Sequence, residues 1–275
     1  MTDDVRDAKG ESRHVVITGG SSGIGLATAE AFGRRGATVS LIARDPDRLA
    51  DAKTCLVRSG IAADIRSADV RDRIALEAAI GELVASHGPC DILVTSAGIA
   101  HPGYIQDLDP QVFREEMDVN YFGTLHAIKA VIPSMIERRR GSIVGVSSAA
   151  GILGIFGYTA YSPTKFAVRG LLESLRAEMR PHDVAVHCVF PADIDTPMLE
   201  RENVIKPPET AAISGTIKPL PPADVAEAIV AAIGKTKFAV YTDTTTRLLG
   251  PVSGFAPSWL SRKLDARARK TNPDG

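Results

Sequence analysis

A tyrosine and a lysine four residues apart, Tyr161 and Lys165, form the pair with the clearest chemical potential in the sequence. Residues at this spacing share one face of a helix, so the two side chains are expected to meet. A free phenol, with a pKa near about 10, is a poor acid at neutral pH, and an adjacent ammonium favours the phenolate. We therefore predict that Lys165 lowers the pKa of Tyr161, which then acts as a general acid or base.

The surroundings of this pair favour catalysis over an ordinary exposed helical contact, which would be worth only a few tenths of a kcal/mol. The apolar run 143–146 predicts a buried strand, and the hydroxyls of Ser147 and Ser148 follow it directly. Helical spacing begins near Thr159 and contains both members of the pair. We expect Ser148 to hydrogen-bond the carbonyl oxygen that receives a proton from Tyr161.

Composition and charge narrow the classes of function. The chain has 275 residues, 44% of them hydrophobic, and a net charge of −1, which gives no electrostatic basis for binding nucleic acid. Three scattered cysteines, Cys55, Cys90 and Cys188, predict neither a disulfide framework nor a metal site. No apolar run approaches the roughly 18 residues of a membrane span. We expect a cytoplasmic globular protein without a transmembrane anchor.

A phosphate-binding turn is predicted near the start of the chain. An apolar strand at 14–18 is followed by a glycine-rich turn and then by helical spacing. Glycines let the backbone approach a pyrophosphate, and the free N–H groups of the first helical turn face it. Because the turn has the required strand before it and helix after it, we predict a dinucleotide site. Its residues are Gly19, Ser21, Ser22, Gly23, Ile24 and Gly25.

The end of the second predicted strand, 38–42, indicates which dinucleotide binds. An acid that holds the adenine ribose of NAD is expected about here, and Asp45 is the candidate. Asp45 precedes Pro46, however, which is typical of a helix N-cap, so we assign it to capping. Arg44 is then free to bind a 2′-phosphate with help from Ser21 or Ser22. This favours NADPH/NADP+ as the cofactor.

Further strands and helices alternate without a break. A strand near 63–66 leads to Asp69 and Val70, where Asp69 contacts the adenine edge or caps the strand end. A strand at 91–95 leads to Ala97 and Gly98, and another lies at 184–190. The alternation predicts an α/β fold with a single doubly wound parallel sheet, a Rossmann fold with helices on both faces. Ligands are then expected at the carboxyl ends of the strands.

A long helix is predicted from Pro110 to Arg138, with Asn120 among its apolar positions. Buried amides need hydrogen-bond partners, so one interpretation is a structural bond to a neighbouring strand. The other interpretation is a water-holding site that passes protons towards Lys165. Both remain open from the sequence.

These motifs together resemble the short-chain dehydrogenase/reductase family, from about His14 to Gly234. Those that carry the resemblance are 18–25, Asp69-Val70, Ala97-Gly98, Asn120, Ser148 and Tyr161-x-x-x-Lys165. The resemblance implies a catalytic tetrad of Asn120, Ser148, Tyr161 and Lys165. It also implies that the nicotinamide is wrapped by the segment containing Pro191, Ile194 and Thr196. The family's usual Asn-Asn-Ala-Gly is Thr95 to Gly98 here, and its Pro-Gly is Pro191-Ala192.

Within that family the chain is most similar to the 3-ketodihydrosphingosine reductases. The matching stretches are 15–25, 41–44, 157–162, 165–170 and 193–197, followed by Glu202-Asn203, Lys206-Pro207 and Glu209-Thr210. This resemblance implies reduction of a lipid-like ketone to a secondary alcohol. Another ketone (3-oxoacyl, steroid or xenobiotic) and a non-catalytic NADPH sensor are the alternatives.

The predicted domain organisation has three parts. Residues 1–13 are polar and expected to be disordered, 14–242 form the catalytic domain, and 243–275 form a C-terminal extension. Within the domain, 196–220 reads as a long irregular lid or, alternatively, a disordered loop. The basic tail, with Trp259, offers weak contact with a membrane surface. Apolar faces on the helices at 110–138 and 159–180 predict a homodimer or homotetramer, because relatives pair through them.

Overall fold

All seven strands of the structure join one parallel sheet. The computed structural model describes residues 12–214 and 218–255. The strand order is β3-β2-β1-β4-β5-β6-β7, and every pairing in it is parallel. The strands are β1 (His14–Thr18), β2 (Thr38–Ala43), β3 (Ala63–Ser67), β4 (Ile92–Thr95), β5 (Gly141–Val146), β6 (Val184–Phe190) and β7 (Ala239–Tyr241). The predicted Rossmann fold is confirmed.

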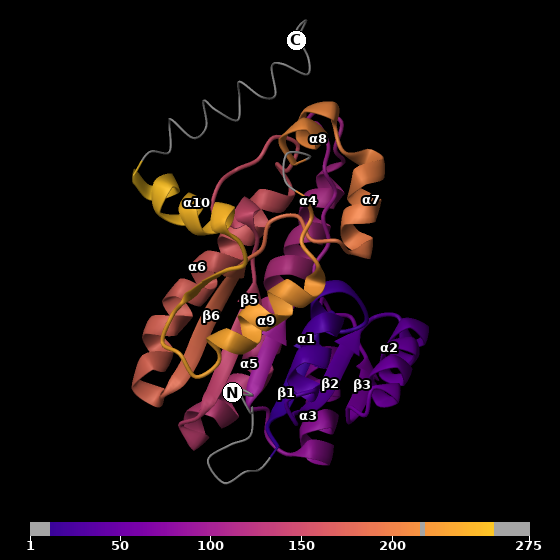
Figure 1. The fold of residues 1–275 in the computed structure, drawn as a ribbon, viewed down its shortest axis with the longest axis vertical. Helices are drawn as coiled ribbons and strands as arrows, with labels where there is room; N and C mark the ends of the chain where they lie inside the picture. Colours follow the sequence, from indigo (N-terminus) through magenta and orange to yellow (C-terminus); the bar gives the residue numbers. More distant parts are fainter. Residues whose placement is uncertain (1–11, 215–217, 256–275) are drawn as a thin grey trace, which may run out of the picture.

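Helices cover both faces of this sheet (Figure 1). Alternate residues of a strand point to opposite faces, so Val15 and Ile17 pack into one core and Val16 into the other. The first core is closed by α1 (Gly23–Gly33), α2 (Pro46–Arg58) and α9 (Pro222–Ala232). The second is closed by α3 (Arg73–His87), α5 (Gly123–Arg138) and α6 (Tyr161–Met179).

The strand order reverses between β1 and β4, which lie side by side at the centre of the sheet. A crevice forms at the carboxyl ends of strands where the order reverses in this way. The chain that leaves each strand approaches the other closely here. A Cβ on Gly19, after β1, would lie 2.6 Å from the backbone nitrogen of Ala97, after β4. Topology thus brings the two predicted cofactor segments together.

The helix predicted over 110–138 is interrupted once. It consists of α4 (Pro110–Met117), a π-helical segment (Asp118–Phe122) and α5. The widened turn contains Asn120, whose side chain is buried. Single π turns inside α-helices are frequent at functional sites. Hydrophobic spacing does not reveal the change, because both sides of it continue in helical register.

The segment predicted as an irregular lid is mainly helical. It contains α7 (Pro197–Ile205) and α8 (Pro208–Ser214), each of which begins at a proline. Proline is well tolerated at the first helical position, so it marked helix starts here rather than a loop. A parallel bridge between Ile194 and Leu220 joins the two ends of the excursion. Figure 1 shows both helices at the end of the molecule that also holds α4. We call residues 196–214 the lid.

Two predictions concern segments that lie outside the described residues. They are the disorder of residues 1–11 and the membrane contact of the tail from 256 onward, which includes Trp259. Ser12 is held by a hydrogen bond from its hydroxyl to the carbonyl of Gly36, 2.7 Å long. The chain continues after β7 into α10 (Thr244–Phe255). No helix within the described ranges is long and apolar enough to cross a membrane.

Candidate active site

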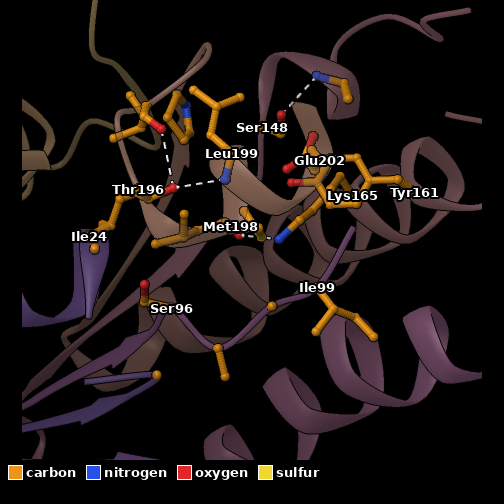
Figure 2. A pocket seen from close by; sticks show the side chains of 18 of the residues that line it. Ile24, Ser96, Ile99, Ser148, Tyr161, Lys165, Thr196, Met198, Leu199 and Glu202 are labelled. Carbon is orange, nitrogen blue, oxygen red and sulfur yellow. Dashed lines mark hydrogen bonds between the residues drawn. The ribbon is translucent and has the colours of Figure 1, made fainter. Parts of the chain in front are cut away.

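One cavity of about 670 Å³ extends from the glycine-rich turn to Tyr161. It is lined by every residue predicted for catalysis or cofactor binding except Gly25 and Asn120. Figure 2 shows Ile24 and Ser96 on one side of this cavity, and Ser148, Tyr161 and Lys165 on the other. The sequence elements predicted to share one sheet edge therefore share one cavity.

The glycine-rich turn has the properties of a phosphate cradle. Gly19 and Gly23 have positive φ angles of 70° and 53°, which favour glycine. A Cβ on Gly25 would lie 2.3 Å from the carbonyl oxygen of Gly19, so a side chain there would collide with the turn. The N-cap residue of α1, Ser22, makes no side-chain capping bond, and the first turn of this described helix has no acidic residue. Its N–H groups and positive dipole end are thus available to a phosphate.

The other end of the cavity carries two guanidinium groups beside two carboxyls. Asp45 accepts hydrogen bonds from the backbone N–H groups of Asp47 and Arg48, both 3.1 Å long, which confirms its assignment as a helix cap. Arg44 and Arg48 both line the cavity. Asp69, the other acid here, is bound at 2.7 Å by Arg71 and lies 3.9 Å from Arg44. Arg48 was not predicted; its position one helical turn after the cap residue was the available signal.

Tyr161 and Lys165 meet on the first turns of α6. The Lys165 Nζ atom lies 5.5 Å from the centre of the Tyr161 ring and donates a 3.1 Å hydrogen bond to the carbonyl of Val146. Both side chains are buried. Ser147 anchors this helix to the end of β5, since its hydroxyl donates to the carbonyl of Lys165 at 2.9 Å. Strand β5 thereby fixes the position of the phenol and the ammonium.

Ser148 lines the cavity with Tyr161, and its hydroxyl acts to lower the pKa of that phenol. Its Oγ also accepts the backbone N–H of Ala150 at 3.1 Å and so caps a short 3-10 helix, Ala149–Gly151. The capping bond therefore helps to fix the hydroxyl at the wall of the cavity. This is the placement expected of a group that orients a carbonyl oxygen.

Burial raises the pKa of Tyr161, and the Glu202 carboxyl raises it further, while the Ser148 hydroxyl acts in the opposite direction. The predicted lowering of this pKa by Lys165 is therefore wrong in direction for the pocket as a whole, since the net shift is upward. Burial lowers the pKa of Lys165 to about 8. The sequence places an ammonium next to the phenol, but it does not show how far both groups are removed from water. A protonated phenol is the form that donates a proton, so the arrangement still provides a general acid.

The side-chain amide of Asn120 makes three hydrogen bonds to its neighbours. It accepts the Ile99 N–H at 2.9 Å, donates to the Ile99 carbonyl at 3.0 Å, and donates to the Thr164 hydroxyl at 2.9 Å. These bonds tie the segment after β4 to α6, so Asn120 has a structural role, although its partners do not lie on a neighbouring strand as that interpretation expected. A part for Asn120 in proton relay stays a prediction.

The substrate side of the cavity combines apolar walls with buried carboxyls. Its apolar lining comes from Leu153, Ile155, Met198, Leu199, Ile213 and Leu249. Glu202 of α7 also faces the cavity and accepts a 2.5 Å hydrogen bond from the hydroxyl of Tyr158. Glu116 of α4 is fully buried, and burial raises its pKa to about 8. Sequence reasoning assigned no role to either carboxyl, since nothing local distinguishes a buried glutamate from an exposed one.

No group of three or more histidine, cysteine, aspartate or glutamate side chains in the described ranges is arranged to hold a metal ion. The described side chains that gather at the cavity are instead a phenol, an ammonium and hydroxyls beside a phosphate cradle. That set can bind a dinucleotide and transfer a proton.

Known proteins with similar sequences agree with this geometry. The family model for short chain dehydrogenases matches residues 13–205. The 3-ketodihydrosphingosine reductase of Dictyostelium discoideum is 37% identical over 272 residues, covering 91% of this chain and 81% of that protein. The Bos taurus enzyme of the same name is 44% identical over 222 residues, covering 79% of this chain and 67% of that protein.

Solved structures share the fold as well. A variant of the actinorhodin polyketide ketoreductase, solved with NADPH, superposes with a TM-score of 0.79 at 30% identity. The match covers 87% of this chain and 97% of that one. A 3-oxoacyl-[acyl-carrier protein] reductase from Brucella melitensis has a TM-score of 0.73 at 30% identity, over 84% of this chain and 90% of that one.

Proposed function

The chain belongs to the short-chain dehydrogenase family, and from this membership and the site geometry we propose that it reduces 3-ketodihydrosphingosine or a closely similar long-chain ketone. It is an oxidoreductase that uses a nicotinamide cofactor. The observation that carries the proposal is that Ser148, Tyr161 and Lys165 face the same cavity as the glycine cradle. If these residues did not act together, there would be no reason for the Ser-Tyr-Lys set and the phosphate cradle to line one cavity.

Each residue of the site has a defined task in this reaction. A nicotinamide cofactor, held by the glycine cradle, would supply the hydride for the carbonyl carbon. The Tyr161 hydroxyl donates its proton to the carbonyl oxygen, and Ser148 holds that oxygen by a hydrogen bond. Lys165, held by the Val146 carbonyl, contributes positive charge beside the phenolate that forms. General acid catalysis of this kind contributes roughly 10²–10⁴-fold.

NADPH is the proposed form of the cofactor. The support is the pair of guanidinium groups, Arg44 and Arg48, that line the cavity together with Ser21 and Ser22. Guanidinium groups bind phosphate oxygens by forked, charge-assisted hydrogen bonds. The acid that would hold a free ribose, Asp45, is used as a helix cap.

A long apolar chain is the proposed remainder of the substrate. The apolar residues of the cavity lie on the lid, on the segment before α6 and on α10, and so come from three separate parts of the fold. They lead away from Tyr161 and would cover hydrocarbon. A homodimer or homotetramer and a cytoplasmic location remain expectations; sedimentation would distinguish an oligomer from the 29.1 kDa monomer.

The direct test measures NADPH oxidation with 3-ketodihydrosphingosine and with short ketones. We expect turnover by the unsubstituted enzyme and a loss of about 10²–10⁴-fold in kcat for Tyr161→Phe, because phenylalanine cannot donate the proton. Cofactor affinity, measured by fluorescence titration, should change little. Tight NADPH binding without turnover of any ketone would instead indicate a cofactor sensor, and full activity in Tyr161→Phe would refute the catalytic assignment.

A further inference from the structure

A carboxyl group lies next to the proposed catalytic tyrosine with no role in the reaction derived above. Glu202 is on α7, is only 6% exposed and lines the catalytic cavity. Its charge acts on both Tyr161 and Lys165. Figure 2 shows it in the same part of the cavity as Ser148, Tyr161 and Lys165. A buried carboxyl at this position is costly to the fold unless it has a partner.

The partners of Glu202 do not fully use its carboxylate. The Tyr158 hydroxyl donates to Oε2 at 2.5 Å, and the Lys206 ammonium lies 3.8 Å from the same oxygen. Within the described chain no hydrogen bond reaches Oε1. The Lys206 side chain is only 2% exposed, and its Nζ has no hydrogen-bond partner among the described residues. This ion pair therefore leaves capacity for another donor.

A second carboxyl lies near Glu202 at the cavity. Asp193 also lines the cavity and interacts with both Glu202 and Lys206. Glu116 is buried nearby, but with a pKa of about 8 it adds little negative charge at neutral pH. Arg201, also on α7, is exposed, lines the cavity and attracts Glu202. An ammonium group on a ligand would be attracted to the two carboxyls, Asp193 and Glu202, that line the cavity here.

The proposed substrate carries such a charge. 3-Ketodihydrosphingosine has a primary amine on the carbon next to its ketone, and this amine is an ammonium at neutral pH. When the ketone oxygen accepts a hydrogen bond from Tyr161 and Ser148, the ammonium must lie within a few ångströms of the phenol. Two carboxyls that line the cavity act on Tyr161, those of Glu202 and Asp193, and Glu202 acts the more strongly.

We propose that Glu202 binds the ammonium group next to the substrate ketone and thereby selects α-amino ketones over ketones that lack the amine. The inference rests on the proposed function, because it assigns a specificity residue to the same site. Tyr158 positions the carboxylate through Oε2, and Oε1 receives the ammonium. A plain 3-oxoacyl chain would leave this carboxylate without its counter-ion.

A substrate pair separates this proposal from a purely structural role. We would measure kcat/KM for 3-ketodihydrosphingosine and for 1-hydroxyoctadecan-3-one, which differs only by replacement of the amine with hydrogen. The unsubstituted enzyme should prefer the amine by about 10–100-fold. In Glu202→Gln, which can still accept the bond from Tyr158, the preference should fall to within about 3-fold of unity, mainly through KM. Glu202→Asp should restore part of it.

Glu209→Gln is the matched control. Glu209 is also a buried lid carboxyl that accepts a bond from a tyrosine, Tyr104, at 2.9 Å, but it does not line the cavity. It should keep the amine preference. An unsubstituted enzyme that reduces both ketones equally, or a Glu202→Gln variant that retains the preference, would overturn the inference. An enzyme that reduces neither ketone would refute the proposed function instead.

Discussion

At the scale of single residues, Arg44 is the side chain that we expect to recognise the adenine end of the cofactor. Its side chain is 57% exposed at the rim of the cavity and lies 3.9 Å from Asp69. Asp69 is already bound by Arg71, so Arg44 retains hydrogen-bonding capacity for a ligand. We therefore expect the charge and hydrogen-bond donors of Arg44, rather than its packing, to affect cofactor binding.

Arg44→Asp should shift cofactor preference from NADPH to NADH. A carboxylate repels the 2′-phosphate and accepts hydrogen bonds from free ribose hydroxyls. We expect the ratio of kcat/KM for NADPH to that for NADH to fall by about 10²-fold, measured with one ketone at fixed concentration. Arg58→Asp changes the same charge on α2 away from the cavity and should leave the ratio unchanged. If Arg44→Asp also leaves it unchanged, the phosphate is recognised elsewhere.

At the scale of elements, the lid is held over the cavity by specific contacts with the segment that precedes α6. Thr210 donates to the carbonyl of Phe156 at 3.0 Å, and Tyr158 binds Glu202. Gly157 lies between these contacts with a φ of +78°, and a Cβ there would lie 2.1 Å from the Thr210 hydroxyl. The close approach of α8 thus requires glycine.

Gly157→Ala should displace the lid without touching Tyr161. Strain from the positive φ and the collision with Thr210 are expected to cost about 1–3 kcal/mol. We expect KM for the long-chain ketone to rise about tenfold, with a smaller change for a short ketone. Gly154→Ala is the control, since a Cβ there meets no atom within 4 Å. Equal KM values in the two variants would show that lid docking does not shape the substrate site.

At the scale of the whole molecule, buried carboxyls couple stability to pH. Glu116 has an ordinary pKa of 4.5, which burial raises to about 8 in the folded protein. Between these values the folded state binds more protons than the unfolded state, so stability falls as the pH rises. Burial also raises the pKa values of Asp193 and Glu202, and both contribute in the same direction.

Glu116→Gln should flatten this dependence. Glutamine has no proton to lose and can still accept the N–H of His101, which now binds Oε1 at 2.5 Å. Between pH 5.5 and pH 8 we expect the melting temperature of the variant to fall at least about 3 °C less than that of the unsubstituted protein, measured by scanning fluorimetry. Glu115→Gln, at the exposed neighbouring position, should not alter the slope. Parallel curves for Glu116→Gln and the unsubstituted protein would contradict this account.

Local periodicity and spacing were enough to predict the sheet, the phosphate cradle and the meeting of Tyr161 with Lys165. Each depends on residues that are close in the sequence: a strand followed by glycines, or two residues one helical turn apart. Asp45 was correctly assigned as a cap for the same reason, because capping involves only the next few residues. The lid was predicted to be irregular but contains two helices. Proline occurs both in turns and at the first position of helices, and the prediction took it as a sign of irregular structure.

Tertiary structure alone decided the charges of the site. The contact between Tyr158 and Glu202 joins residues 44 apart, and so does that between Asn120 and Thr164. No local pattern specifies such contacts. The pKa of Tyr161 is governed by how much water the assembled fold removes and by a carboxyl from the lid, rather than by the lysine beside it in the sequence. Sequence spacing determined which groups meet on α6, and packing across the fold determined the electrostatic environment in which they react.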